Sequence, residues 1–164
     1  MRIQILFLAI ITGFLLTGCG VGVFAQKTVP PPFGIDKRPQ PSGADLNVLL
    51  PKKVGTFERE DFPAGLKPPT DEDLTVEYKS GEDSIFFGFS IPDTEKDAFE
   101  AVKMTRQEAI QSRLNIKGEQ YRIGKNPSFF KLDAFMSWTR GRYFFYAKAG
   151  TPRALESFMK AFPY

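Results

Sequence analysis

The sequence predicts an α+β domain in which an antiparallel sheet of about six strands packs with two helices. Two pairs of segments with alternating apolar residues, each pair joined by a short turn, predict two β-hairpins. Two segments with helical spacing predict one helix between the hairpins and another at the end. The predicted order is three strands, a helix, three or four strands and a helix. An arrangement with both helices on one face of the sheet is the alternative.

The first half of the predicted sheet precedes residue 92. Residues 54–60 alternate loosely and predict a first strand. Apolar residues then occupy alternate positions on both sides of the polar turn 80–83, which predicts a hairpin over 74–91. Pro92 ends this hairpin because proline has no backbone N–H to donate.

A helix is predicted from Asp93 to about Leu114. Glu95 and Asp97 place negative charge in its first turn, where the helix dipole favours it. A rough stripe along this helix holds Phe99, Val102, Arg106, Ala109 and Ile110. Residues 116–123 predict the strand that follows.

The second hairpin and the last helix occupy the end of the chain. Alternating residues predict strands over 134–138 and 143–149, with the turn at Arg140 and Gly141. Thr151 is the expected N-cap of the last helix, and Pro152 suits its first position. The apolar face of this helix holds Leu155, Phe158, Met159 and Phe162.

This order of elements, from Leu46 to Phe162, resembles the PsbP-like family. In that family a curved antiparallel sheet is packed between helices, and the chain closes with a short apolar helix. The resemblance lies in the pattern of elements, so it implies a fold and no activity. Some bacterial lipoproteins share this fold.

Residues 1–18 predict a lipoprotein signal peptide. Arg2 supplies a positive charge, and residues 3–16 are apolar apart from Gln4 and Thr12. This run is shorter than the roughly 20 apolar residues that a membrane-spanning helix needs. The segment therefore predicts export rather than a permanent span.

The tetrapeptide Leu16-Thr17-Gly18-Cys19 resembles the lipobox of bacterial lipoproteins. The resemblance implies that the Cys19 thiol receives a diacylglycerol group, that cleavage occurs just before it, and that a fatty acid such as palmitate acylates the new N-terminus. Several acyl chains would anchor the protein stably, since each buried methylene contributes about 0.8 kcal/mol. Two alternatives remain open: Cys19 is an ordinary small apolar residue of the signal, or a soluble-secretion peptidase cuts after residues 23–25.

The stretch 19–45, which follows the signal, predicts a tether. It is rich in glycine and proline, and three prolines are consecutive from Pro30 to Pro32. Proline favours the extended polyproline II conformation, so we expect a semi-rigid spacer. A proline-rich docking motif is the alternative. Residues 46–164 have the usual size of one domain and predict a single α+β domain.

Composition argues against catalysis and metal binding. The chain has no histidine and one cysteine, so the usual general base and, after lipidation, a thiol nucleophile are missing. Zinc and copper sites prefer these same side chains. Acidic clusters at 58–61, 71–73 and 82–83 lack the spacing of a calcium loop. We therefore expect no enzymatic activity, no metal and no cofactor.

Aromatic and basic residues of the second hairpin predict a possible binding patch. Its members are Trp138, Arg140, Arg142, Phe144 and Tyr146. Aromatic residues occupy both faces of the strand 143–149, which predicts either a core covered on both sides or a groove. Basic residues interleaved with aromatics also suit nucleic acid, but an exported domain has little occasion to meet nucleic acid.

Charge is divided unevenly along the chain. Residues 54–100 hold 13 acidic and 4 basic side chains, whereas residues 115–164 hold 9 basic and 3 acidic ones. Such a division would give the domain an electrostatic dipole, unless the fold interleaves the two segments, which is the outcome we expect.

These features together predict a lipid-anchored protein of the cell membrane or outer membrane whose domain faces the periplasm or the cell exterior. We expect a non-enzymatic interaction or accessory module of a cell-envelope complex, with an envelope protein as partner and no nucleic acid. A carrier or sensor that binds a hydrophobic ligand is the alternative, and a hydrolase is a more distant one.

Overall fold

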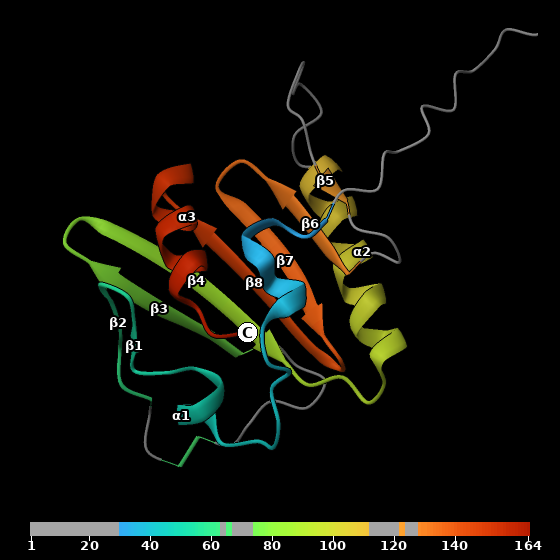
Figure 1. The fold of residues 1–164 in the computed structure, drawn as a ribbon, viewed down its shortest axis with the longest axis horizontal. Coiled ribbons are helices and arrows are strands. Elements are labelled where there is room, and N and C mark those ends of the chain that lie inside the picture. The colour runs from blue at the N-terminus through green and yellow to red at the C-terminus, as the bar shows by residue number, and fades with distance from the viewer. Residues whose placement is uncertain (1–29, 63–64, 67–73, 112–121, 124–127) are drawn as a thin grey trace, which may run out of the picture.

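An open antiparallel β-sheet forms the centre of the fold (Figure 1). The computed structural model describes residues 30–62, 65–66, 74–111, 122–123 and 128–164. Within these residues the sheet has eight strands in the order β1-β2-β3-β4-β8-β7-β6-β5, and all neighbouring strands are antiparallel. Helices pack against this sheet, so the predicted α+β class is confirmed.

The elements have the following bounds. The strands are β1 (Lys53–Val54), β2 (Phe57–Arg59), β3 (Leu74–Ser80), β4 (Asp83–Ser90), β5 (Arg122–Ile123), β6 (Phe129–Leu132), β7 (Phe135–Arg140) and β8 (Tyr143–Ala149). The helices are the 3-10 helix η1 (Pro32–Lys37) and the α-helices α1 (Leu46–Leu49), α2 (Glu95–Gln111) and α3 (Pro152–Ala161).

Both predicted hairpins are present. Strands β3 and β4 pair along their length, and so do β7 and β8. Gly81 and Gly141 form the two turns with positive φ angles of 59° and 60°, which glycine adopts without steric cost. Strand β4 pairs with β8, so the two hairpins lie side by side and join the halves of the sheet.

Three details differ from the prediction. The expected strand 54–60 is two short strands that turn at Gly55, whose φ is +60°. Strand β6 was not expected, because consecutive apolar residues such as Phe129 and Phe130 hide the alternation of a strand. In α2, Val102 is buried as expected, but Ala98 is buried in place of Phe99, which is only partly buried. Most of the expected strand 116–123 lies outside the described residues.

Helix α3 covers one face of the sheet, which we call the α3 face. Thr151 Oγ1 accepts a hydrogen bond from the Ala154 N–H at 3.1 Å, so the predicted N-cap is confirmed. The four apolar residues predicted for this helix are buried. The ring of one of them, Phe158, contacts three aromatic rings of the sheet: Phe57, Tyr78 and Phe87. The α3 face therefore carries the larger core.

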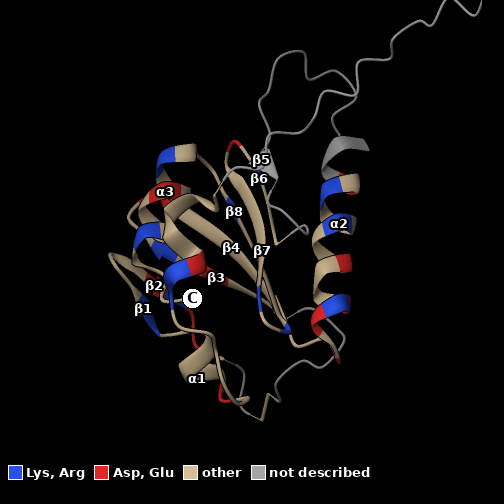
Figure 2. Ribbon diagram, turned by 45° about the vertical axis from the view of Figure 1, so that its right-hand side comes forward, with Lys and Arg blue, Asp and Glu red and all other residues tan. Residues whose placement is uncertain are grey.

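Helix α2 lies on the opposite face, which we call the α2 face (Figure 2). Ala98 and Val102 belong to a smaller buried cluster together with residues of β6 and β8: Phe130, Leu132 and Phe144. The hydroxyls of Thr105 and Ser137 form a hydrogen bond of 2.8 Å between α2 and β7. The alternative with both helices on one face is therefore wrong.

Residues 30–45, predicted as part of the tether, lie against the domain, and we call them the N-terminal strap. Ile35 of the strap is buried in the larger core. The Arg140 guanidinium donates hydrogen bonds to the backbone carbonyls of Asp36 and Arg38. The packed domain therefore includes residues before 46, because a proline-rich segment can still bury an apolar side chain and have its carbonyls bound. Residues 19–29 lie outside the described residues.

None of the helices described in the structure is long and apolar enough to cross a membrane. The predicted signal peptide, residues 1–18, and Cys19 lie outside the described residues.

Candidate functional site

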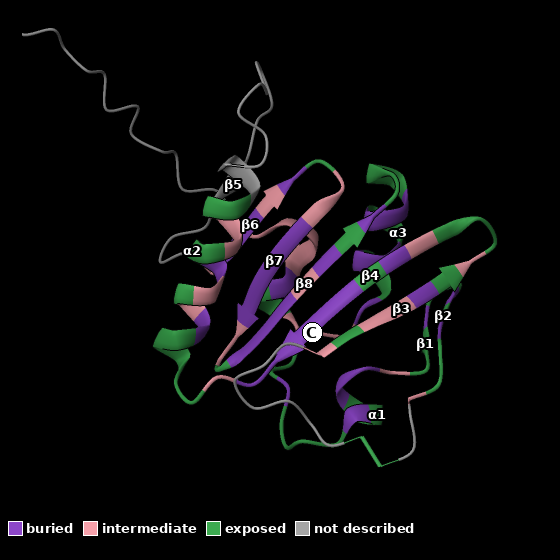
Figure 3. Ribbon diagram, turned by 180° about the vertical axis from the view of Figure 1, so that it is seen from behind, coloured by how far each residue is buried: buried purple, intermediate pink, exposed green. Residues whose placement is uncertain are grey.

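The α2 face is covered by its helix over one half only. Helix α2 packs against β6, β7 and β8, and Figure 3 shows β3 and β4 next to them with no described helix in front. We call this half the bare strip; on the α2 face it carries Thr75, Glu77, Lys79, Ser84, Phe86 and Gly88. The side chain of Phe86 is 49 % exposed although it lies within a strand. A single exposed aromatic side chain is common on protein surfaces, and it indicates a binding surface only together with neighbouring apolar side chains.

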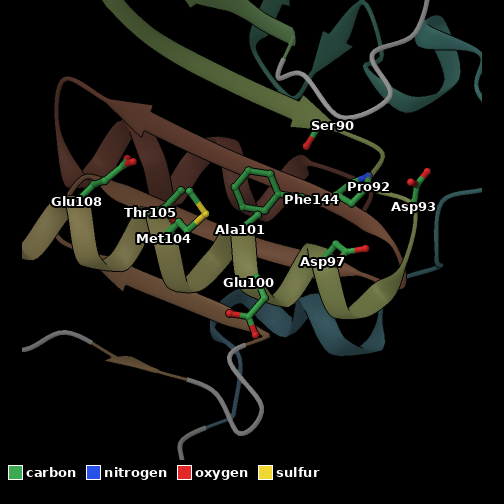
Figure 4. A pocket seen from close by; sticks show the side chains of 10 residues that line it. All are labelled: Ser90, Pro92, Asp93, Asp97, Glu100, Ala101, Met104, Thr105, Glu108 and Phe144. Atoms are coloured by element: carbon green, nitrogen blue, oxygen red, sulfur yellow. The ribbon is translucent and has the colours of Figure 1, made fainter.

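A groove of about 610 Å³ runs between α2 and the adjoining end of β4 (Figure 4). Its lining comprises Ser90, Pro92, Asp93, Asp97, Glu100, Ala101, Met104, Thr105, Glu108 and Phe144. Ser90 and Phe144 are partners across β4 and β8, and the next pair on the same face is Gly88 and Tyr146. The floor of the groove therefore continues into the bare strip.

The wall of the groove is one side of α2. Its lining residues are spaced by three or four positions, which brings them to the same side of a helix. Asp97, Glu100 and Glu108 are exposed on this wall, and Met104 between them is 59 % exposed. None of the ten lining residues is lysine or arginine. The groove therefore combines an acidic rim with apolar contacts from Met104 and Phe144.

Tyr146 forms a platform beside the groove. A Cβ atom at Gly88 would lie 1.9 Å from the Tyr146 ring, so the ring rests directly on the backbone of β4. The Tyr146 hydroxyl is 3.0 Å from Thr75 Oγ1 on β3, so this side chain spans from β8 across β4 to β3. The ring centroids of Phe144 and Tyr146 are 6.0 Å apart. The floor is thus an aromatic surface in which the Tyr146 ring is held by the backbone at Gly88 and by the hydrogen bond between its hydroxyl and Thr75.

The positive charge of the bare strip is offset. Lys79 forms ion pairs with Glu60 at 2.7 Å and with Glu77 at 3.1 Å. Hydrogen bonds to Glu60 and then to Glu77 raise the pKa of Lys79, since both carboxylates favour its charged form. Lys148 of β8 is exposed opposite Phe86, at the end of the strip away from the groove. The groove end of this surface is therefore acidic.

The structure does not bring the predicted patch together on one surface. Trp138 is fully buried on the α3 face, where its ring stacks on that of Phe145 at 5.4 Å. Arg140 binds the N-terminal strap, and Arg142 is exposed in the turn. Phe144 and Tyr146 do lie together, on the α2 face. Trp138 pairs with Phe145 across β7 and β8, so it lies on the face of Phe145, whereas Phe144 and Tyr146 flank Phe145 in β8 and point to the other face.

The predicted acidic clusters behave as surface charge in the part of the chain described. Asp61 pairs with Lys52 at 2.6 Å, and Arg59 is buried with its Nε donating to the Leu50 carbonyl. Residues 71–73 lie outside the described residues. Among the described residues, no three acidic, histidine or cysteine side chains are grouped so as to hold a metal.

Charge from the two halves of the chain is interleaved, as expected. Helix α2 carries acidic residues of the first half onto strands β6, β7 and β8 of the second half (Figure 2). Sequence reasoning missed the acidic wall of α2 and the exposed Phe86. A spacing of three or four positions places one set of residues on the same side of the helix: Asp97, Glu100, Met104 and Glu108. The sequence could therefore have predicted an acidic side of α2, but not whether that side faces the sheet or solvent.

Comparison with known proteins finds no relative of this chain. No family model matches the chain, and no curated protein or solved structure matches it either.

Replacing Gly88 by alanine tests the aromatic platform. We expect Gly88→Ala to lower the free energy of unfolding by about 1–3 kcal/mol, because the new methyl group displaces the Tyr146 ring. In a Tyr146→Ala background the same change should be close to neutral, since the space is empty and alanine suits a strand better than glycine. Urea unfolding of the wild type, the two single variants and the double variant measures the free-energy change caused by Gly88→Ala in each background. Equal losses in the two backgrounds would show that the ring does not rest on Gly88.

Proposed function

We propose that this protein is a lipid-anchored lipoprotein of the bacterial cell envelope whose domain binds a partner protein and catalyses no reaction. The observation that carries the proposal is the unequal covering of the two sheet faces. The α3 face is filled by α3 and the N-terminal strap. The α2 face leaves a bare strip and an open groove that present Phe86, Met104 and Tyr146.

The N-terminus supports the anchored part of this proposal. The lipobox resemblance at residues 16–19 provides the acylated cysteine, and the domain is already packed at Ile35. The 11 residues from 20 to 30 connect Cys19 to the described part of the chain and span at most about 40 Å when extended. The domain would therefore work close to the bilayer, on the periplasmic or outer side of the cell membrane or the outer membrane.

A PsbP-like fold is part of the same proposal. The sheet lies between α2 and α3, and α3 is a short helix with one apolar face, in agreement with the pattern of that family. A likeness of fold carries no activity with it, so the function rests on the surface alone.

A carrier of a small hydrophobic ligand is the second candidate. The groove volume of about 610 Å³ falls within the usual range of small-molecule sites. Its openness to solvent and its four carboxylates favour a protein partner, because a carrier of apolar ligands encloses them away from water.

Labelling with an alkyne analogue of palmitate tests the anchor. We expect the full chain, produced in a lipoprotein-making bacterium, to incorporate the label, and Cys19→Ala to lose it because the thiol is the first acylated group. Detection by click chemistry after denaturing electrophoresis is the measurement. An unlabelled wild-type protein whose N-terminus is Gln26 would instead establish soluble secretion.

Photo-cross-linking in intact cells tests the binding surface. A benzoylphenylalanine residue is introduced into the full chain at position 86, 104 or 48. Val48 is the matched control, since its 51 % exposure lies between those of Phe86 and Met104, and it is part of α1, away from the α2 face. We expect a discrete cross-linked protein from positions 86 and 104 and none from 48. Cross-links from position 48 alone, or from none of the three, would contradict the proposal.

A further inference from the structure

We propose that the groove and the bare strip receive a positively charged amphipathic helix of the partner protein, laid beside α2. This inference rests on the proposed binding function and adds the chemistry of the partner. Three features of the surface carry it: its width, its apolar contacts and its charge.

The bare strip has the width of one helix. Helix α2 occupies the α2 face over β6, β7 and β8, and β3 and β4 remain beside it. Two strands spaced by about 4.8 Å give a strip about 10 Å wide. A helix with its side chains is about 10 Å across, and packed helices lie about 8–10 Å apart. A second helix would therefore complete the cover that α2 begins.

The apolar contacts favour a helix with one apolar face. Phe86 rises from the strip at 49 % exposure, and Met104 faces the groove from α2 at 59 % exposure. Phe144 and Tyr146 lie between them as the aromatic floor. Methionine adapts its shape to different partners, as binding surfaces for amphipathic helices require. One apolar stripe along the incoming helix would cover Phe86, Met104 and Tyr146, whereas Phe144 is already buried beneath α2.

The charge of the wall requires basic residues on the flank of that helix. Asp93, Asp97, Glu100 and Glu108 line the groove, which includes no lysine or arginine. Among the described residues, Glu100 is the only one of these four that forms an ion pair, with Lys103 three positions along α2. Lysine or arginine on the incoming flank would complement these carboxylates. A second copy of the domain would instead place carboxylates against carboxylates, and anionic lipid or nucleic acid would be repelled.

A designed peptide provides the test. The full chain is held in nanodiscs of uncharged phosphatidylcholine, and the probe is a fluorescent 18-residue amphipathic helix made of leucine and lysine; binding to empty nanodiscs is subtracted. The groove variant combines Asp97→Asn, Glu100→Gln and Glu108→Gln. The control variant removes the same charge outside the groove through Glu82→Gln, Asp83→Asn and Glu156→Gln. All six positions are exposed. Because Asp97 accepts a hydrogen bond from Thr94 at the start of α2, thermal melting of both variants verifies that the fold is kept.

We expect fluorescence anisotropy at low salt to show affinity reduced about tenfold in the groove variant and less than twofold in the control variant, because only the first removes charges that contact the helix. Equal reductions in both variants would overturn the inference, since they would indicate diffuse attraction. Equal binding of a leucine–glutamate probe would overturn the charge requirement. In either case cross-links from position 104 would still support the proposed binding function. The inference about the partner helix and the proposed binding function can therefore fail separately.

Discussion

The first part of strand β8, from Tyr143 to Phe145, is buried on both faces, and the arrangement of the other elements depends on this. It lies between β4 and β7 in the middle of the sheet and connects the two hairpins. Phe145 projects into the larger core under α3, while Phe144 projects into the smaller cluster under α2. A strand with aromatic residues on both faces is stable only if each face is covered, so one helix must lie on either side.

The two faces receive different amounts of cover. The α3 face is closed by α3, by the N-terminal strap and by packed aromatic rings, and Arg140 and Tyr143 fix the strap through its backbone carbonyls. On the α2 face, α2 reaches β8, and no other described helix covers β3 and β4. Tyr146 partly substitutes for the missing cover by lying over Gly88. The surface that remains is apolar at its floor and acidic at its wall, and this combination defines the proposed partner.

Local patterns in the sequence predicted the elements that bury one face and missed those that depend on distant contacts. Alternation located both hairpins, and Thr151 located the start of α3. Strand β6 has apolar residues on both faces, so alternation is lost there. The proline content of residues 30–45 predicts an extended backbone, but it does not predict that Ile35 packs into the larger core. For the site, Phe144 and Tyr146 were predicted correctly as neighbours, whereas Trp138 needed its register with Phe145 to be placed in the core.

Native mass spectrometry of the full chain, released from membranes in mild detergent, tests most directly whether the α3 face is filled and the function lies on the α2 face. The account predicts a mass equal to residues 19–164 plus the N-terminal acyl groups, because the described aromatic rings of the α3 face pack against one another. A reproducible additional mass of one small hydrophobic molecule would contradict it, and would favour a carrier over a binding module.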